Sequence, residues 1–217
     1  KGGSQTPDRW LKWSRSIQIS YMRHVSAFGR RQMVTESDEI IYGRFLKERK
    51  NADFAVLLER HRDNLLLFVN GFVHNLEDAE DIMLDAFAAT AAGPVLFEGR
   101  SSFKTWLYGI ARNKALMHLR KHKHEAEVAL VDVEEPVSDE KLPEANIILS
   151  EQKKTILKAL KALQKDYRDT LYLIYFEDMS HDQVAKVLKK TKKQVYNLAN
   201  RGRERLREIL GPQDDLL

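Results

Sequence analysis

The stretch SSFKTWLYGIARNKALMHLRKHK, residues 101–123, combines a helical apolar pattern with uninterrupted positive charge. Ser101 or Ser102 is suited to cap a helix, and apolar residues recur at helical spacing after it. Residues 100–124 contain seven lysines and arginines and no acid. A solvated helix usually mixes both signs, because opposite charges four residues apart stabilise it. The stretch therefore predicts a basic helix whose buried face is formed by Phe103, Trp106, Leu107, Ile110 and Met117.

A basic helix with aromatic and amide side chains is suited to nucleic acid. Lysine and arginine neutralise phosphates, aromatic rings stack on exposed bases, and amides bond base edges. Trp106, Tyr108 and Asn113 supply the rings and the amide. It is equally open from the sequence that Trp106 and Tyr108 are core residues under a positive surface. The cations of this candidate binding helix include Lys104, Arg112, Lys114 and Arg120.

The composition indicates a highly charged globular protein without extracellular or membrane features. Of 217 residues, 43% are hydrophobic and 31% are charged. The absence of cysteine excludes disulfides and thiolate metal sites and fits a reducing compartment. No apolar run approaches the roughly 18 residues of a membrane span, and no signal peptide is recognisable. Few glycines and prolines and little strand-like alternation predict an all-α fold.

Charge divides the chain into segments. The basic N-terminal extension is either a docking or autoinhibitory segment or a loosely ordered tail. The acidic segment holds eight acids, one lysine and two prolines, which predicts a flexible linker of charge −7. Two small helical domains flank it. The predicted order is extension 1–36, first domain 37–124, linker 125–146, second domain 147–210 and tail 211–217.

Acidic residues cluster at the start of a predicted helix, residues 76–92. Acids in a first turn favour the helix dipole, but Asp78, Asp81 and Asp85 also share one face. One alternative is a helical enzyme that binds metal through these carboxylates. Such sites need a second cluster, often Glu-x-x-His, and this motif is absent from the sequence. His122 and His124 are interpreted as extending the basic helix, so we expect no catalysis, cofactor or metal.

The segment SHDQVAKVLKKTKKQVYNLANRGRERL, residues 180–206, has the pattern of a helix-turn-helix. Ser180 and Gln183 form a capping box, and a turn over residues 189–191 precedes a longer helix. A plain helical hairpin is the alternative. In a helix-turn-helix the second helix enters the major groove, where Asn and Arg read base edges. Its polar face carries Lys193, Tyr196, Asn197, Asn200 and Arg201, and Lys192 and Arg203 are placed for phosphate.

The chain resembles a bacterial RNA polymerase sigma factor of the extracytoplasmic-function type, group IV of the sigma-70 family. The resemblance covers about residues 39–210. It rests on three segments in this order and spacing: NLEDAEDIMLDAFAAT (75–90), FKTWLYGIARNKALMHLRKHK (103–123) and FEDMSHDQVAKVL (176–188). It implies a cytoplasmic, non-enzymatic subunit, nucleoid-associated within the holoenzyme. Such a subunit directs transcription initiation from −35 and −10 promoter elements.

The resemblance also implies a role for each site. Core RNA polymerase would be bound through the clamp helices of its largest subunit and the flap of its second-largest, and an anti-sigma factor would be a further partner. The clamp-binding carboxylates would be Asp78, Asp81 and Asp85. The loop at 95–102 and the basic helix would melt and hold the −10 element through Phe97, Ser102, Lys104, Trp106, Tyr108, Arg112, Asn113, Lys114 and Arg120. The second domain would read the −35 element through Lys192, Lys193, Tyr196, Asn197, Asn200, Arg201 and Arg203.

The sequence departs from the family at one turn, and one rival function has to be weighed. The turn at Lys189 and Lys190 lacks the glycine that the family often has there, which puts its geometry in question. A two-domain helix-turn-helix repressor or activator would instead bind palindromic DNA as a dimer. The sequence has no dimerisation heptads, and a sensor domain has no use for an all-basic helix.

Overall fold

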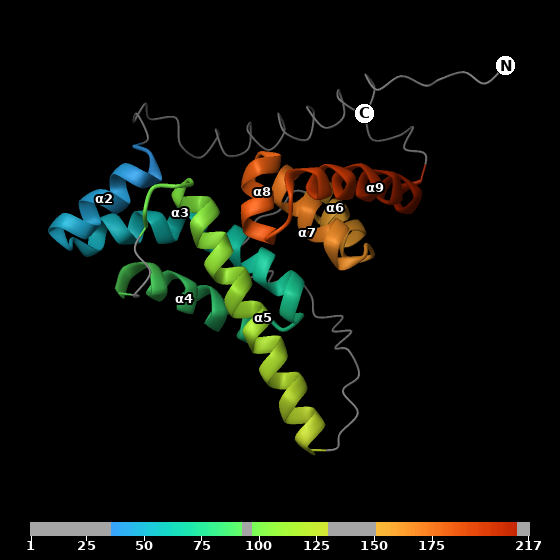
Figure 1. The fold of residues 1–217 in the computed structure, drawn as a ribbon, viewed down its shortest axis with the longest axis horizontal. Coiled ribbons are helices and arrows are strands. Elements are labelled where there is room, and N and C mark those ends of the chain that lie inside the picture. Colours follow the sequence, from blue (N-terminus) through green and yellow to red (C-terminus); the bar gives the residue numbers. More distant parts are fainter. Residues whose placement is uncertain (1–35, 93–96, 130–150, 212–217) are drawn as a thin grey trace. The chain divides into compact units, whose positions relative to one another are not determined.

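A computed structural model of the protein describes residues 36–92, 97–129 and 151–211 (Figure 1). Every regular element in this part is an α-helix, which confirms the predicted all-α class. The predicted N-terminal extension up to residue 35, most of the linker and nearly all of the tail lie outside the described residues. The helices are α2 (Asp38–Glu48), α3 (Asn51–Val73), α4 (Leu76–Ala92), α5 (Phe103–Ala129), α6 (Glu151–Lys161), α7 (Lys165–Tyr175), α8 (His181–Leu188) and α9 (Lys192–Leu210).

Helices α2 to α5 pack around a common apolar core. The rings of Tyr42 and Phe103 lie 5.0 Å apart, and the Tyr42 hydroxyl donates to the Thr90 carbonyl at 2.7 Å. The start of α5 is fixed from two sides. The Phe103 N–H donates to the Glu39 carboxylate of α2 at 2.9 Å, and the Thr105 N–H donates to the Ser102 hydroxyl at 3.2 Å. An acid at this end also favours the helix dipole.

Helix α5 differs from the prediction in its length and its buried face. It continues to Ala129, five residues into the predicted linker, since the added residues are mostly good helix formers. Phe103, Leu107, Ala111 and Ala115 are completely buried. This stripe advances four residues at a time and places Met117 on the outer side of the helix, with 66% of its surface exposed. The assignment of Met117 to the buried face is therefore wrong.

Helices α6 to α9 form the second group, with α8 and α9 as the helix-turn-helix. Both capping boxes are complete, Ser180 with Gln183 and Thr191 with Gln194. Helix α9 crosses α7 at Gly202, where an added Cβ would lie 3.2 Å from side-chain atoms of Leu171 and Tyr167. A glycine is therefore needed for this close approach.

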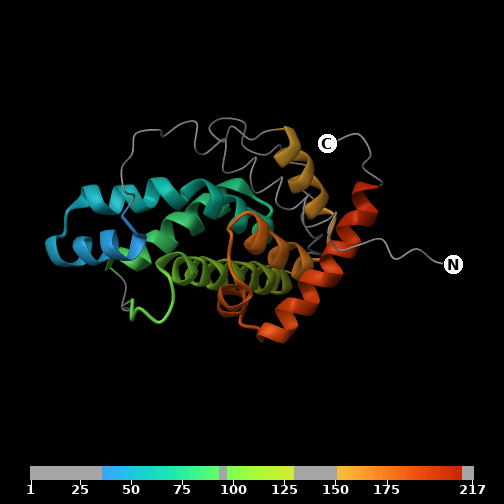
Figure 2. The same ribbon diagram turned by 90° about the horizontal axis from the view of Figure 1, so that it is seen from above.

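The two helical groups contact each other within one compact unit, Ser37–Leu217. Helix α8 packs against α5, side by side in both ribbon views (Figures 1 and 2). Helix α7 reaches α3, where the Tyr172 hydroxyl donates to the Asn64 carbonyl at 2.8 Å. The first turns of the basic helix thus lie under the helix-turn-helix. Among the described helices, no stretch combines the length and the apolar character that crossing a bilayer requires.

Candidate nucleic-acid and protein interfaces

The outer face of α9 presents a polar stripe. Lys193, Tyr196, Asn197 and Arg201 are exposed at helical spacing, and 56% of the Tyr196 surface is open to solvent. Their positions follow from the opposite face, where Val195, Ala199, Gly202 and Leu206 are buried. The structure thus brings the predicted base-reading residues together on one exposed surface.

The remaining predicted residues of α9 are held by neighbours. Lys192 forms an ion pair with Asp182 of α8 at 2.7 Å. Arg203 donates to the side chain of Asn200 and, at 3.1 Å, to the Ala199 carbonyl. Both Asn200 and Arg203 are half-buried. Arg203 is thus engaged with its own helix.

The aromatic residues of the basic helix divide between surface and core. Trp106 is half-buried in a ring cluster, with centroids 5.7 Å from Tyr42, 5.3 Å from Phe97 and 6.0 Å from Phe103. Tyr108 has no exposed surface, and its ring lies 5.1 Å from that of Phe68. Tyr108 therefore has the core role that the sequence left open, and it presents no ring to a base in this conformation.

The second domain covers the start of the basic helix. Lys104 forms an ion pair with the buried Glu177 at 2.7 Å and also donates to the Glu177 carbonyl at 2.7 Å. The Gln183 amide donates to the Ser102 hydroxyl at 3.3 Å, and Lys186 donates to the Arg100 carbonyl at 2.6 Å. Two predicted nucleic-acid contacts, Ser102 and Lys104, are thus engaged within the protein.

The later part of the basic helix is more open. Asn113 and Lys114 are half-buried, and Arg120 is exposed. Lys114 forms an ion pair with Asp85 of α4 at 3.1 Å. Arg112 faces the acids Asp169 and Asp166 of α7, and burial lowers the pKa of its guanidinium from the ordinary value. Of Lys104, Arg112, Lys114 and Arg120, only Arg120 is exposed, and the other three are half-buried.

The predicted carboxylates lie on the outer side of α4. Asp81 is exposed, and the side chain of Asp85 is 70% exposed despite its ion pair with Lys114. Asp78 lies closer to α5, 3.4 Å from His118. Leu84 lies between these acids and is 48% exposed, although it is a large apolar residue. Sequence reasoning missed Leu84, because apolar residues in a helix are first assigned to the core.

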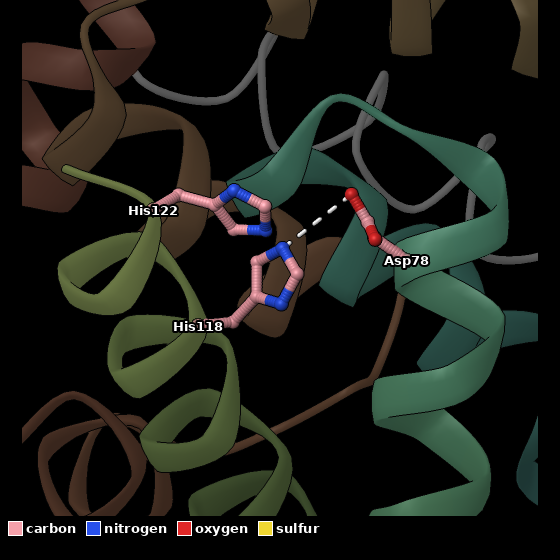
Figure 3. Close-up of side chains that lie close together, drawn as sticks. All are labelled: Asp78, His118 and His122. Carbon is pink, nitrogen blue, oxygen red and sulfur yellow. Dashed lines mark ion pairs between the residues drawn. The ribbon is translucent and has the colours of Figure 1, made fainter. Parts of the chain in front are cut away.

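The structure also gathers three possible metal ligands: Asp78, His118 and His122 (Figure 3). Asp81 and Asp85 do not join this group. The three carboxylates considered from sequence therefore do not gather at one point, whereas Asp78 lies in a mixed group with two histidines. The signal in the sequence was the spacing of His118 and His122, four residues apart on one helix.

Comparisons with known proteins match both domains. The family model of Sigma-70 region 2 matches residues 57–125, and that of Sigma-70 region 4 matches residues 153–206. The RNA polymerase sigma-H factor of Pseudomonas aeruginosa is 28% identical over 83% of this chain and 97% of its own. The extracytoplasmic-function sigma factor SigW of Bacillus subtilis is 30% identical over 79% of this chain and 98% of its own.

Solved structures of sigma factors also resemble this chain. The sigma factor RpoE of Bartonella quintana, in complex with the anti-sigma factor NepR, aligns with a TM-score of 0.59 and 26% identity. The alignment covers 73% of this chain and 96% of RpoE. CnrH, in complex with the cytosolic domain of CnrY, shares the fold with a TM-score of 0.56 and 21% identity, over 81% of this chain and 97% of CnrH. The chain belongs to the extracytoplasmic-function family of RNA polymerase sigma factors, which bind core polymerase and direct it to promoters.

Proposed function

We propose that this sigma factor reads its −35 element with the exposed polar stripe of α9. The observation that carries the proposal is the exposure of Tyr196, Asn197 and Arg201 on the face opposite the buried side. Asn and Arg each match a base edge with two hydrogen bonds. Tyr196 adds an exposed ring to this surface.

Two alanine variants of the stripe test the −35 proposal. Asn197→Ala and Arg201→Ala should each weaken binding to the preferred promoter by about 1–3 kcal/mol, with a smaller loss on unrelated duplexes. Lys192→Ala is the control, because loss of a phosphate contact weakens all sequences about equally. Fluorescence anisotropy of the holoenzyme on matched and scrambled −35 duplexes gives the comparison. Equal losses on both duplexes for Asn197→Ala and Arg201→Ala would contradict the assignment.

For the −10 element, we propose that the exposed part of α5 and the loop before it contact the melted strand. Asn113 and Arg120 are accessible as the structure stands, whereas Ser102 and Lys104 are covered by the second domain. Trp106 and Phe97 supply ring faces at the rim of the core, suited to a base that has left the stack. Full −10 contact therefore requires α8 to move away from α5.

The exposed face of α4 is our candidate for the polymerase clamp helices. Asp81, Asp85 and the exposed Leu84 combine negative charge with an apolar contact. Charges of this kind guide association, and a central apolar anchor supplies much of the binding energy. The second domain would bind the polymerase flap. An anti-sigma factor partner is supported by the RpoE–NepR complex.

We also infer that the protein acts without catalysis of its own and works in the cytoplasm, where polymerase and promoter DNA are. The family assignment supports both inferences. The repressor alternative lacks support of this kind. The two relatives named above are RNA polymerase sigma factors, and this chain aligns with nearly their whole length.

A further inference from the structure

Two histidines of α5 and one carboxylate of α4 point toward one another (Figure 3). His118 and His122 are one helical turn apart, with ring centroids separated by 4.3 Å. The Asp78 carboxylate lies 3.4 Å from the Nε2 of His118. One ligand atom from each of the three residues lies within 4.8 Å of the other two.

The two helices hold this cluster in place. Helices α4 and α5 pack against each other, and Ala79 and Ile82 of α4 and Ala115 of α5 are buried. Asn75 fixes the first turn of α4, because its side-chain oxygen accepts the Asp78 N–H at 3.0 Å. The helices are paired again further along by Lys114 and Asp85. The three side chains therefore converge from two helices that pack against each other.

The donor set is that of a transition-metal site. Zinc is bound by imidazole nitrogens and carboxylate oxygens, and three protein ligands leave a fourth position open. Two histidines at positions i and i+4 of a helix present their rings to one ion. A tetrahedral ion with bonds of about 2.0 Å needs its ligand atoms ~3.3 Å apart. The His118–Asp78 pair already has about this separation, and a ring nitrogen of His122, which is exposed, lies within 4.8 Å of the other two ligand atoms.

We propose that Asp78, His118 and His122 form a binding site for one divalent transition-metal ion, best suited to Zn²⁺. The sequence alone led us to expect no metal. Imidazole nitrogens exclude Mg²⁺ and Ca²⁺ as preferred ions, since these select oxygen ligands. The exposed position of His122 gives the ion a path from solvent and leaves the fourth position open to water or to a ligand from a partner.

Metal binding would alter the surface proposed for polymerase, a consequence that rests on that proposed function. Coordination engages Asp78 and adds two positive charges to a face where Asp81 and Asp85 are exposed. A basic clamp surface would then be attracted less strongly. Zinc should therefore weaken the association of this sigma factor with core polymerase and act as a regulatory ligand.

Calorimetric titration of the metal-stripped, untagged full chain with ZnCl₂ tests the site. We expect one Zn²⁺ per chain and a higher melting temperature with zinc, because the ion binds the folded state. Asp78→Ala, His118→Ala and His122→Ala should each lower the affinity at least tenfold, with unchanged circular dichroism. His124→Ala is the matched control, an exposed histidine of the same helix outside the cluster. Absence of binding, or equal affinity in all four variants, would overturn the site.

Polymerase affinity measured with and without zinc tests the consequence separately. Zinc should weaken core binding by the wild type at least threefold and leave His118→Ala unaffected. Equal weakening of both proteins would overturn the link between the site and polymerase. If the wild type fails to bind core polymerase even without zinc, the proposed function of α4 fails, while calorimetry still decides the metal site.

Discussion

Lys189 ends α8 in the left-handed backbone conformation, with φ of 53°, at a position where the family often has glycine. The turn is nevertheless well formed. The backbone N–H groups of Lys189 and Lys190 both donate to the Ala185 carbonyl. A non-glycine residue in this conformation costs about 1–2 kcal/mol. The turn therefore forms without glycine, and the cost is backbone strain at Lys189.

Replacing Lys189 with glycine should relieve this strain. We expect Lys189→Gly to raise the free energy of unfolding by about 0.5–1 kcal/mol, less than the full strain because glycine also gains entropy when unfolded. Lys189→Ala removes the same charge but keeps the Cβ, so it should leave stability nearly unchanged. Urea denaturation of the three proteins gives the comparison, and equal stability of the glycine and alanine variants would contradict the strain.

Asp169 of α7 is a buried carboxylate among cations. Burial raises its pKa from the ordinary 3.8 to about 6, although Lys165 and Arg168 act in the lowering direction. Arg112 faces it from α5, and Asp166 adds a like charge. Because the folded protein holds this proton more tightly than the unfolded chain, Asp169 makes stability fall as pH rises from about 4 to about 6. The full effect is of order 3 kcal/mol.

Asp169→Asn should remove this contribution. The free energy of unfolding of the variant, relative to wild type, should therefore rise as pH increases from about 4 to about 6. Asp166→Asn serves as the control, since it lies on the same helix with 56% of its side chain exposed. Denaturant titrations across this range give the difference curve. A difference that stays flat with pH would show that Asp169 is ionised throughout.

At the scale of single helices, the sequence predicted much of the structure, because capping signals and apolar spacing are local. The helix-turn-helix and the capping box at Ser180 are examples. The burial of Tyr108 and the exposure of Met117 were not decidable, because they depend on how α5 is rotated against α3 and α4. The cluster of Asp78 with His118 and His122 likewise needs two helices in a fixed register.

The acidic face of α4 carries a prediction of its own. Asp81→Lys combined with Asp85→Lys should weaken core polymerase binding at least tenfold while circular dichroism stays unchanged, because both side chains are largely exposed. The control with the same charge change is Glu48→Lys combined with Glu59→Lys, at exposed positions of α2 and α3. Surface-immobilised core polymerase gives the affinities. Equal affinities of the two double variants for core polymerase would show a general effect of charge and would contradict the proposed interface on α4.

At the scale of the whole molecule, the two DNA-binding domains cover one another in part. The ion pair between Lys104 and Glu177 lies in this contact, with the Glu177 side chain fully buried. Charge segregation in the sequence predicted two domains along the chain, with Lys104 in the first and Glu177 in the second. The charge pattern could not predict the contact between Lys104 and Glu177. In the sequence Glu177 looks like an ordinary surface acid, and Lys104 lies 73 residues away.

Weakening that contact should open the protein. Glu177→Gln keeps the side-chain shape and removes the charge partner of Lys104 in a buried contact, which should raise the open population at least several-fold. The chain has no cysteine, so Val56→Cys and Ile209→Cys, both at exposed positions, allow specific dye pairs. Single-molecule energy transfer should shift to longer distances in the variant. Lys190→Ala, whose partner Asp166 lies within the second domain, should leave the distances unchanged, and an unshifted Glu177→Gln would contradict the role of the ion pair.

The most direct test of the central claim is promoter-dependent transcription by bacterial core RNA polymerase supplemented with this chain. On a library of genomic fragments, we expect stable co-elution with core polymerase and discrete RNA start sites that share two upstream sequence elements. Failure to bind polymerase, together with tight binding of the free protein to a palindromic duplex, would contradict the account and establish a repressor or activator instead.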